Sequence, residues 1–395
     1  MPQVPMQLFS TELRHRLTGL RRELHRYPEL ALQEFRTAER LCEELATLDL
    51  GTVDRVAGTG IRARIPGTNR GLRAVAIRGD IDALPITEET GVDFASVNRG
   101  VMHACGHDVH AAWTIGAAHL LKDDPASGDV VVLLQPAEET GQGAQAMIAA
   151  DVLDGVAVIF GAHVDLRFEV GTVVAQSGNA AGSTDEFFIV LTGGGSHAAR
   201  PHEGRDPIVG AAALVTSLQT IVSRRIPPGV PAVVTVSTIA AGTATNVVPR
   251  DAHISGTLRA ADRDTRALLQ AQLREMTAAV ARANGLSAEC QIRPGTPPLT
   301  NPPDIVQWAQ AAVGRTLGDA ALIPLPVPNL GGEDFAFYME RIPGCFLRIG
   351  GRRSDQEPVP AHSSGFLPDD GAVLVGAAVL AELARTASRE LNASG

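Results

Sequence analysis

The sequence predicts an α/β fold, in which a mixed, mostly parallel β-sheet with flanking helices carries an inserted α+β domain. Short apolar runs alternate with helix-forming segments, a pattern typical of strands joined by helical crossovers. Near residue 180 this alternation is replaced by a separate set of strands and helices, and it returns near residue 295. A chain of 395 residues also exceeds the usual size of one hydrophobic core. We therefore expect a discontinuous domain of residues 1–180 and 295–395, and an inserted domain of residues 181–294.

The first domain begins with two predicted helices. Leucines recur at helical spacing from Ser10 to Tyr27, where Pro28 ends the helix, and a second apolar stripe runs from Phe35 to Leu48. Strands and one further helix (141–150) follow, with the strands expected at residues 58–66, 73–78, 130–134 and 156–160. In a sheet of this kind, ligands gather beyond the carboxyl ends of the strands.

The inserted domain is predicted to combine four strands with two helices. The helices are expected at residues 208–222 and 265–283, and the strands at residues 187–191, 233–239, 253–258 and 287–292. Such a domain could pair edge to edge with a copy of itself, so it is also a candidate dimerisation domain.

Composition excludes several classes of protein. A formal net charge of −10 argues against a nucleic-acid partner. The sequence shows no run of about 18 apolar residues, so we expect no membrane span. Its first residues lack a basic and apolar leader, and its 4 cysteines are scattered. These features predict a cytoplasmic protein that acts on a small molecule.

One eight-residue motif, from His103 to His110, is rich in metal-ligating side chains. Within it, the Cys105 thiol and the His107 imidazole are ligands typical of zinc or a similar transition metal. We expect the other histidines of the motif, His103 and His110, to support the site rather than to bind metal.

The missing ligands follow other apolar runs. Glu138 and Glu139 come after the strand predicted at residues 130–134, His163 follows the next, and His362 lies near the C-terminus. Each of these residues alone is more often an ordinary turn or surface residue. Together they form a set sufficient for two divalent ions, namely Cys105, His107, Glu139, His163 and His362.

The neighbouring carboxylates can divide the work of a metal-assisted hydrolysis. One member of the Glu138–Glu139 pair would bind metal, and the other would take the proton from the attacking water. Asp80 or Asp82, which follow the strand at residues 73–78, would orient a ligand imidazole.

The inserted domain contributes three polar candidates. His197 follows three glycines, Asn246 offers an uncharged donor, and Arg259 offers a fork for a carboxylate. Taken alone, each is better explained as a turn, cap or surface residue.

Several motifs together resemble the dinuclear-metal amidohydrolases. These are the N-acyl-amino-acid hydrolases, hippurate hydrolases and auxin-conjugate hydrolases, which are related to aminoacylase and carboxypeptidase G. The resemblance covers the chain from about Arg22 to beyond His362. It is carried by Asp80-Ile-Asp-Ala-Leu-Pro, His103-Ala-Cys-Gly-His-Asp, Gln135-Pro-Ala-Glu-Glu, His197-Ala-Ala-Arg-Pro-His, Asn246-Val-Val-Pro and Gly331-Gly-Glu-Asp-Phe.

The resemblance implies a zinc-exopeptidase-like fold and roles for the candidate residues. It implies metal binding by the five predicted ligands and Glu138 as general base, oriented by Asp80 or alternatively by Asp82. It implies that His197 stabilises the oxyanion, in its own site or in a partner's, and that Asn246 and Arg259 hold the substrate. The chain departs from the family pattern at Gly194-Gly195-Ser196 and after His163, positions that bear on the acyl preference.

The predicted function is hydrolysis of N-acyl amino acids, with acetyl or benzoyl as candidate acyl groups. A metallo-dipeptidase or carboxypeptidase is the alternative enzyme, and a non-catalytic binder of metal or amino acid is the alternative outside enzymes. Zinc is the favoured metal, with manganese, cobalt and nickel left open. A homodimer or homotetramer formed through the inserted domain is expected.

Overall fold

The computed structural model describes residues 4–393 and divides into two compact units. The first contains the chain up to Gly178, Asn301–Pro326 and the chain from Phe337 on, and the second contains Asn179–Thr300 and Val327–Ala336. Residues 327–336 were expected in the first domain, but in the structure they group with the second unit. The segment bonds to the start of the second unit, where the Gly182 N–H donates to the Gly331 carbonyl at 2.9 Å.

A mixed seven-stranded sheet forms the centre of the first unit. The strand order is β1-β2-β4-β3-β5-β15-β6, with β3, β4, β5 and β15 pairing in parallel and the other pairs antiparallel. The strands are β1 (Thr52–Val56), β2 (Gly60–Ile65), β3 (Ala74–Asp80), β4 (Val130–Gln135), β5 (Val156–Glu169), β6 (Val173–Val174) and β15 (Gly344–Arg352). The predicted α/β class with a mixed, mostly parallel sheet is confirmed.

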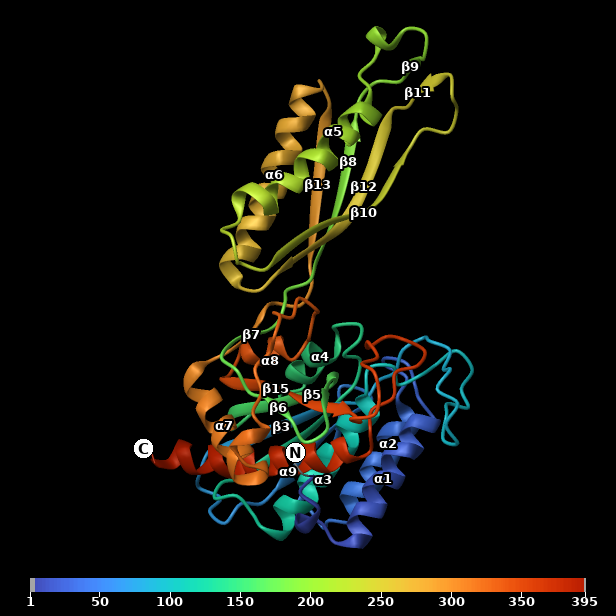
Figure 1. Cartoon of the computed structure of the whole chain (residues 1–395). Coiled ribbons are helices and arrows are strands. Elements are labelled where there is room, and N and C mark those ends of the chain that lie inside the picture. Colours follow the sequence, from blue (N-terminus) through green and yellow to red (C-terminus); the bar gives the residue numbers. More distant parts are fainter. Residues whose placement is uncertain (1–3, 394–395) are drawn as a thin grey trace. The chain divides into compact units, whose positions relative to one another are not determined.

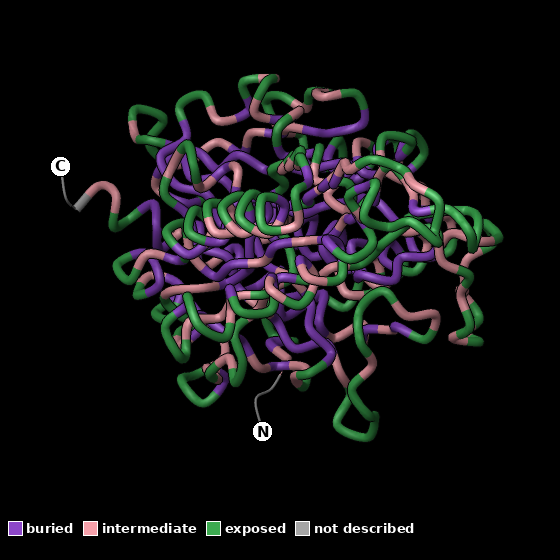
Figure 2. The backbone as a smooth tube through the Cα atoms, turned by 90° about the horizontal axis from the view of Figure 1, so that it is seen from above, coloured by how far each residue is buried: buried purple, intermediate pink, exposed green. Residues whose placement is uncertain are grey.

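Continuous apolar runs make the middle strands of this sheet. Every residue of β3 and β4 is buried, as expected for strands covered on both faces. Figure 2 shows such buried segments of the backbone surrounded by exposed loops. Helices α3 (His107–Asp123) and α9 (Gly371–Ala393) pack against β3 and β5, and Figure 1 shows α4 (Gly143–Ala149) on the opposite side of the sheet.

The close approach of α3 and α9 depends on a missing side chain. A Cβ atom at Gly376 would lie 2.3 Å from the fully buried Trp113 ring. Helix α3 begins at His107, which is part of the predicted metal motif. The packing of α9 against α3 therefore fixes the position of that motif. The remaining helices of the first unit are α1 (Thr11–Arg26), α2 (Phe35–Ala46) and α7 (Pro303–Leu317), with α8 (Ala336–Met339) at the boundary.

Two helical stretches, which the sequence analysis did not find, are long and apolar enough to cross a membrane: residues 207–225 and 371–392. The second stretch has 83% of its apolar window buried inside the protein. The first buries Ala211, Leu214 and Leu218 in the core of the second unit. The 371–392 stretch is thus buried as a core helix is, whereas only 33% of the window at residues 207–225 is buried.

The second unit is an antiparallel sheet with two helices. Its strands follow the order β10-β12-β8-β13, and a short pair, β9 (Ser196–His197) with β11 (Val247–Val248), extends from it. The larger elements are β8 (Asp185–Thr192), α5 (Pro207–Thr220), β10 (Ala232–Ala241), β12 (Asp251–Ala260), α6 (Arg263–Ala283) and β13 (Ser287–Pro294). Alternate residues of β8 and β12 are buried, so the sheet packs one face against a core.

A buried ion pair joins this sheet to α6. Asp185 is fully buried, and its carboxylate accepts hydrogen bonds from Arg266 (2.6 and 3.0 Å) and Gln270 (2.8 Å). Burial by itself would raise the pKa of Asp185, but these bonds outweigh it and hold the pKa below its usual value.

We predict that Asp185→Asn lowers the free energy of unfolding of the second unit by about 2–3 kcal/mol at pH 7, because Arg266 loses its charged partner. A carboxyl whose folded pKa is depressed stabilises the fold above its unfolded pKa of about 3.9, and that stabilisation is lost as the pH falls through the folded pKa. The difference between wild type and variant should therefore stay constant above about pH 5 and shrink below about pH 4.

Urea unfolding followed by hydrogen exchange in β8 and α6 measures this difference. Glu289→Gln, an exposed neutralisation on the adjacent β13, is the matched control and should leave stability unchanged. An Asp185→Asn effect that persists undiminished at pH 3 would contradict the ion-pair assignment.

Candidate active site

The predicted metal motif lies at the turn that starts α3. Gly106 is the N-terminal cap of the helix and has a φ of 90°, in the left-handed region that favours glycine. A Cβ atom at this position would also lie 2.3 Å from the Val164 side chain on β5. Glycine is therefore required at position 106 for two reasons, its backbone conformation and its close contact with β5. The turn brings the side chains before and after Gly106 against the end of β5.

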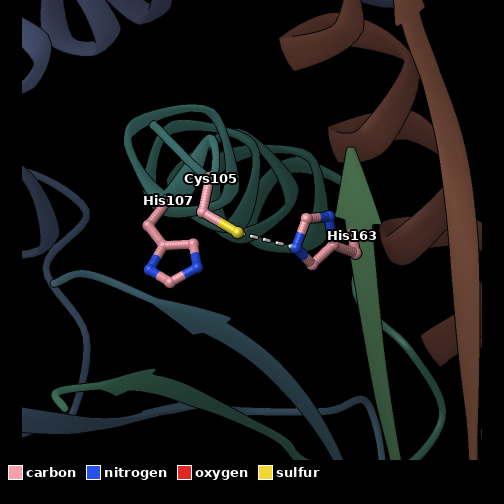
Figure 3. A group of neighbouring side chains, drawn as sticks. All are labelled: Cys105, His107 and His163. Atoms are coloured by element: carbon pink, nitrogen blue, oxygen red, sulfur yellow. Dashed lines mark hydrogen bonds between the residues drawn. The ribbon is translucent and has the colours of Figure 1, made fainter. Parts of the chain in front are cut away.

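Cys105, His107 and His163 converge at this turn. Figure 3 shows the Cys105 sulfur pointing at the His163 ring, with the His107 ring beside it. The distance from Cys105 Sγ to His163 Nε2 is 3.2 Å, and one potential ligand atom from each residue lies within 4.8 Å of the others. Cys105 and His107 are buried, and His163 is partly exposed.

The Glu138–Glu139 pair follows β4 and is held by its backbone. The N–H groups of Glu138 and Glu139 donate to the two carboxylate oxygens of Asp82 at 3.1 and 3.0 Å. His107 Nδ1 lies 2.9 Å from the Asp82 carbonyl and 3.2 Å from its Oδ1. Asp82 thus joins the carboxylate pair to one of the predicted ligand imidazoles.

Sequence reasoning missed a second support of the same turn. Glu34 is fully buried, accepts the Ala137 N–H at 2.9 Å, and receives the Thr59 hydroxyl at 2.6 Å. Ala137 has a φ of 54°, so the turn before Glu138 has an unusual backbone that this bond stabilises. In the sequence, Glu34 is an ordinary carboxylate just before a helix, and nothing local predicts its contact with Ala137.

His362 reaches the cluster from the C-terminal part of the chain. Its N–H donates to the Ala104 carbonyl at 2.8 Å, and its Nε2 lies 3.4 Å from Glu139 Oε2. Its side chain is 53% exposed, so it forms the open side of the cluster. Cys105, Glu139 and His362 make a second group with ligand atoms within 4.8 Å of one another.

The donor atoms of the cluster fit metal ions. Among residues 4–393, the buried atoms His107 Nε2 and Glu139 Oε1 have no hydrogen-bond partner, yet they lie 3.8 Å apart. Unpaired buried polar atoms are costly unless something else satisfies them. Burial and the charge of Glu139 raise the pKa of the Cys105 thiol well above its usual value, so its thiolate needs a nearby cation. Burial lowers the pKa of His163 well below its usual value, which keeps its imidazole in the neutral form that metals bind.

The two candidate orienting carboxylates, Asp80 and Asp82, contact different groups. Asp80 Oδ1 lies 2.6 Å from His110 Nδ1, and its Oδ2 pairs with Arg78. Burial would raise the pKa of Asp80, but the Arg78 guanidinium and the neighbouring histidines hold it well below its usual value. The direct contacts to the carboxylate pair come from Asp82, the alternative that the sequence left open.

In the second unit, His197 and Asn246 lie side by side and exposed. His197 pairs with Val247 between β9 and β11, and the Ala198 N–H donates to the Asn246 carbonyl at 3.0 Å. The Ala199 N–H donates to His197 Nδ1 at 3.0 Å, so a neutral ring carries its proton on Nε2. That proton is available to an acceptor outside the unit.

Arg259 lies elsewhere in the same unit. It is opposite Val233 on β10, near the end of β12, whereas β9 and β11 lie beyond the other end, which begins at Asp251. Eight residues of strand correspond to roughly 26 Å. Within the second unit, Arg259 is therefore not brought together with His197 and Asn246. Figure 1 shows β9 and β11 beyond one end of the sheet.

Known proteins of similar sequence cover almost the whole chain. An N-acetyl-L-cysteine deacetylase of Bacillus subtilis (strain 168) is 39% identical over 383 residues, which are 96% of this chain and 90% of that protein. Thermostable carboxypeptidase 1 of Saccharolobus solfataricus is 34% identical over 382 residues, 94% of this chain and 95% of that protein.

A solved structure agrees with these sequence matches. It is a Bacillus subtilis protein described as a dinuclear metal binding peptidase from the M20 family, with a TM-score of 0.85 and 34% identity. The match covers 96% of this chain and 99% of that one. The model of peptidase family M20/M25/M40 matches residues 76–386. The chain belongs to this family, as its motifs predicted.

Proposed function

We propose that the cluster around Cys105 is the active site in which this chain hydrolyses N-acyl amino acids, with acetyl among the acyl groups it accepts. The observation that carries the proposal is that a thiol, imidazoles and a carboxylate pair from separate segments meet in one cluster, in which, within residues 4–393, His107 Nε2 and Glu139 Oε1 have no hydrogen-bond partner. Relatives named as deacetylases of acetylcysteine and of acetyldiaminopimelate support the amide substrate. The chain is a hydrolase of amide bonds in N-acyl amino acids and binds two divalent metals.

The proposed ligands are Cys105, His107, Glu139, His163 and His362, with Cys105 in both groups of donors. A bound pair of divalent ions supplies Lewis acidity, which acidifies a water and polarises the scissile carbonyl. Zinc is the proposed ion because a thiolate is among the donors.

Glu138 is the proposed general base. Its side chain is 11% exposed, and its Oε2 lies 3.8 Å from His107 Nε2, so it borders the same space as the ligands. It would take the proton of the attacking water and return it to the leaving nitrogen, so that a carboxylate and a free amine are released. Asp82 is the proposed orienting residue, because it holds the backbone N–H groups of both glutamates.

The inserted unit is proposed to act across copies of the chain. His197 would donate its Nε2 proton to the developing oxyanion, and Asn246 would contact the same part of the substrate. A small substrate cannot span the distance to Arg259, so we propose that Arg259 holds the substrate carboxylate in the site of a different copy from that served by His197. This arrangement requires at least a homodimer, which we propose forms through the second unit.

A cytoplasmic location is also proposed, since Cys42, Cys105, Cys290 and Cys345 are all free.

We predict that Glu138→Ala lowers kcat by about 10²–10⁴-fold, because the attacking water loses its base. Metal content should remain that of the wild type, since Glu139 rather than Glu138 is the proposed ligand. Elemental analysis and steady-state kinetics on the same preparation measure both quantities. Glu203→Ala, which removes an exposed glutamate of the second unit, is the control and should change neither. A Glu138→Ala enzyme with near wild-type turnover would refute the base.

We predict two metals per chain by elemental analysis, and release of free amino acid from N-acetyl amino acids that stops after chelation and returns on reloading. Dipeptides and N-benzoyl amino acids belong in the same panel. Faster cleavage of dipeptides would favour the carboxypeptidase alternative, which the Saccharolobus relative supports. Metal binding without cleavage of any member would point to a binding protein.

We predict that two inactive variants complement each other when produced together. In a dimer of one Glu138→Ala chain and one His197→Ala chain, one site keeps both residues if His197 serves the partner, so about half of the wild-type activity should return. Differently tagged chains allow the mixed dimer to be purified and assayed. A mixed dimer as inactive as its parents would show that His197 serves its own chain.

A further inference from the structure

We propose that Arg78, Asp80 and His110 form a buried relay that positions the His163 imidazole through the backbone of Val164. This inference rests on the proposed function, since it concerns one of the proposed metal ligands. It gives Asp80 a role different from that of Asp82. We call these three residues and the Val164 backbone the His110 relay.

The relay begins with a charge pair in the interior. Arg78, Asp80 and His110 are each 0% exposed. Arg78 donates to Asp80 Oδ2, and its Nε donates to Gln135 Oε1 on β4 at 2.9 Å. The other oxygen of Asp80 is thereby directed at His110 Nδ1, 2.6 Å away. The carboxylate is fixed from two sides and has little freedom to move.

His110 passes this constraint to β5. The Val164 N–H donates to His110 Nε2 at 2.9 Å. An N–H can only donate, so His110 Nε2 carries no proton and Nδ1 carries the proton that Asp80 accepts. β3 pairs with β5 only as far as Arg78 opposite Gly161. Beyond that point His110 supplies the acceptor that a neighbouring strand would have supplied.

Val164 in turn fixes His163. The Val164 carbonyl accepts from His163 Nδ1 at 2.7 Å, which leaves Nε2 without a proton and facing Cys105 Sγ at 3.2 Å. The His110 ring is stacked on Trp113 (4.5 Å between ring centroids) and meets the His163 ring at 70° (4.7 Å). A shift of His110 therefore moves both the peptide and the ring next to it.

The second ligand imidazole, His107, also touches the relay, with its ring 5.3 Å from that of His110 and its Nε2 3.8 Å from Asp80 Oδ1, but its Nδ1 is held from another side. His107 Nδ1 is held by the carbonyl and the carboxylate of Asp82, which also holds Glu138 and Glu139. Loss of the His110 relay should accordingly disturb His163 and spare the group of Cys105, Glu139 and His362. Residues that only stabilise the fold would not discriminate between these two groups.

The test compares His110→Phe, which keeps an aromatic ring on Trp113 but removes both hydrogen bonds, with His119→Phe on the same helix. Cobalt titration followed by absorbance and calorimetry reports each binding event. His110→Phe should weaken one of the two cobalt ions by about 10–100-fold and leave the other unchanged. Wild-type affinity for both ions, or equal loss of both, would overturn the relay. His119→Phe should bind both ions like the wild type.

A metal-free measurement separates the relay from the proposed function. Ring ¹⁵N chemical shifts of the wild-type apoprotein should show His110 and His163 protonated at Nδ1, and this requires no variant to fold. A His163 protonated at Nε2 would overturn the relay. If the predicted ring shifts are found but the wild type binds no pair of metals, the relay is supported and the proposed function fails.

Discussion

The carboxylate of Asp82 is the contact on which the arrangement of the cluster depends. It accepts the N–H groups of Glu138 and Glu139, and His107 lies within bonding distance of both its carbonyl and its Oδ1. Asp82 follows β3 and the glutamates follow β4, so one buried side chain joins the ends of two neighbouring parallel strands. Leaving either N–H group unpaired in the interior would cost about 1–3 kcal/mol. The positions of the two glutamates and of His107 therefore depend on the same side chain.

Two histidines near this carboxylate, His107 and His163, are held in the same way. In His107 and His163, Nδ1 bonds to a backbone carbonyl, so Nε2 is left without a proton. Within residues 4–393, His107 Nε2 has no hydrogen-bond partner, whereas His163 Nε2 lies 3.2 Å from Cys105 Sγ. Polar atoms are rarely left unpaired in a protein interior unless an ion or water completes them. In the proposed site the donor atoms are therefore placed before an ion binds, and the energetic cost of their burial would become part of the affinity for metal.

In the second unit, by contrast, the candidate substrate-binding residues lie far apart. Its sheet holds His197 and Asn246 beyond one end and Arg259 near the other. An antiparallel strand is too stiff to bring these ends together, because its backbone is fully bonded to its neighbours. Polar groups placed in this way cannot serve one small ligand within one unit, but they can serve two sites in an assembly.

The sequence by itself determined the fold class, the four strands and two helices of the inserted unit, and the family. Apolar periodicity is local, and the motif around Cys105 and His107 has ligand chemistry at short spacing, so both can be recognised without a structure. Only the tertiary structure decided which partners meet over long separations. It assigned Asp82 to the glutamates and Asp80 to His110, brought Glu34 to the turn before Glu138, and placed residues 327–336 in the second unit. These pairings depend on which strands are neighbours and how far each extends, and a single sequence carries no local signal for either.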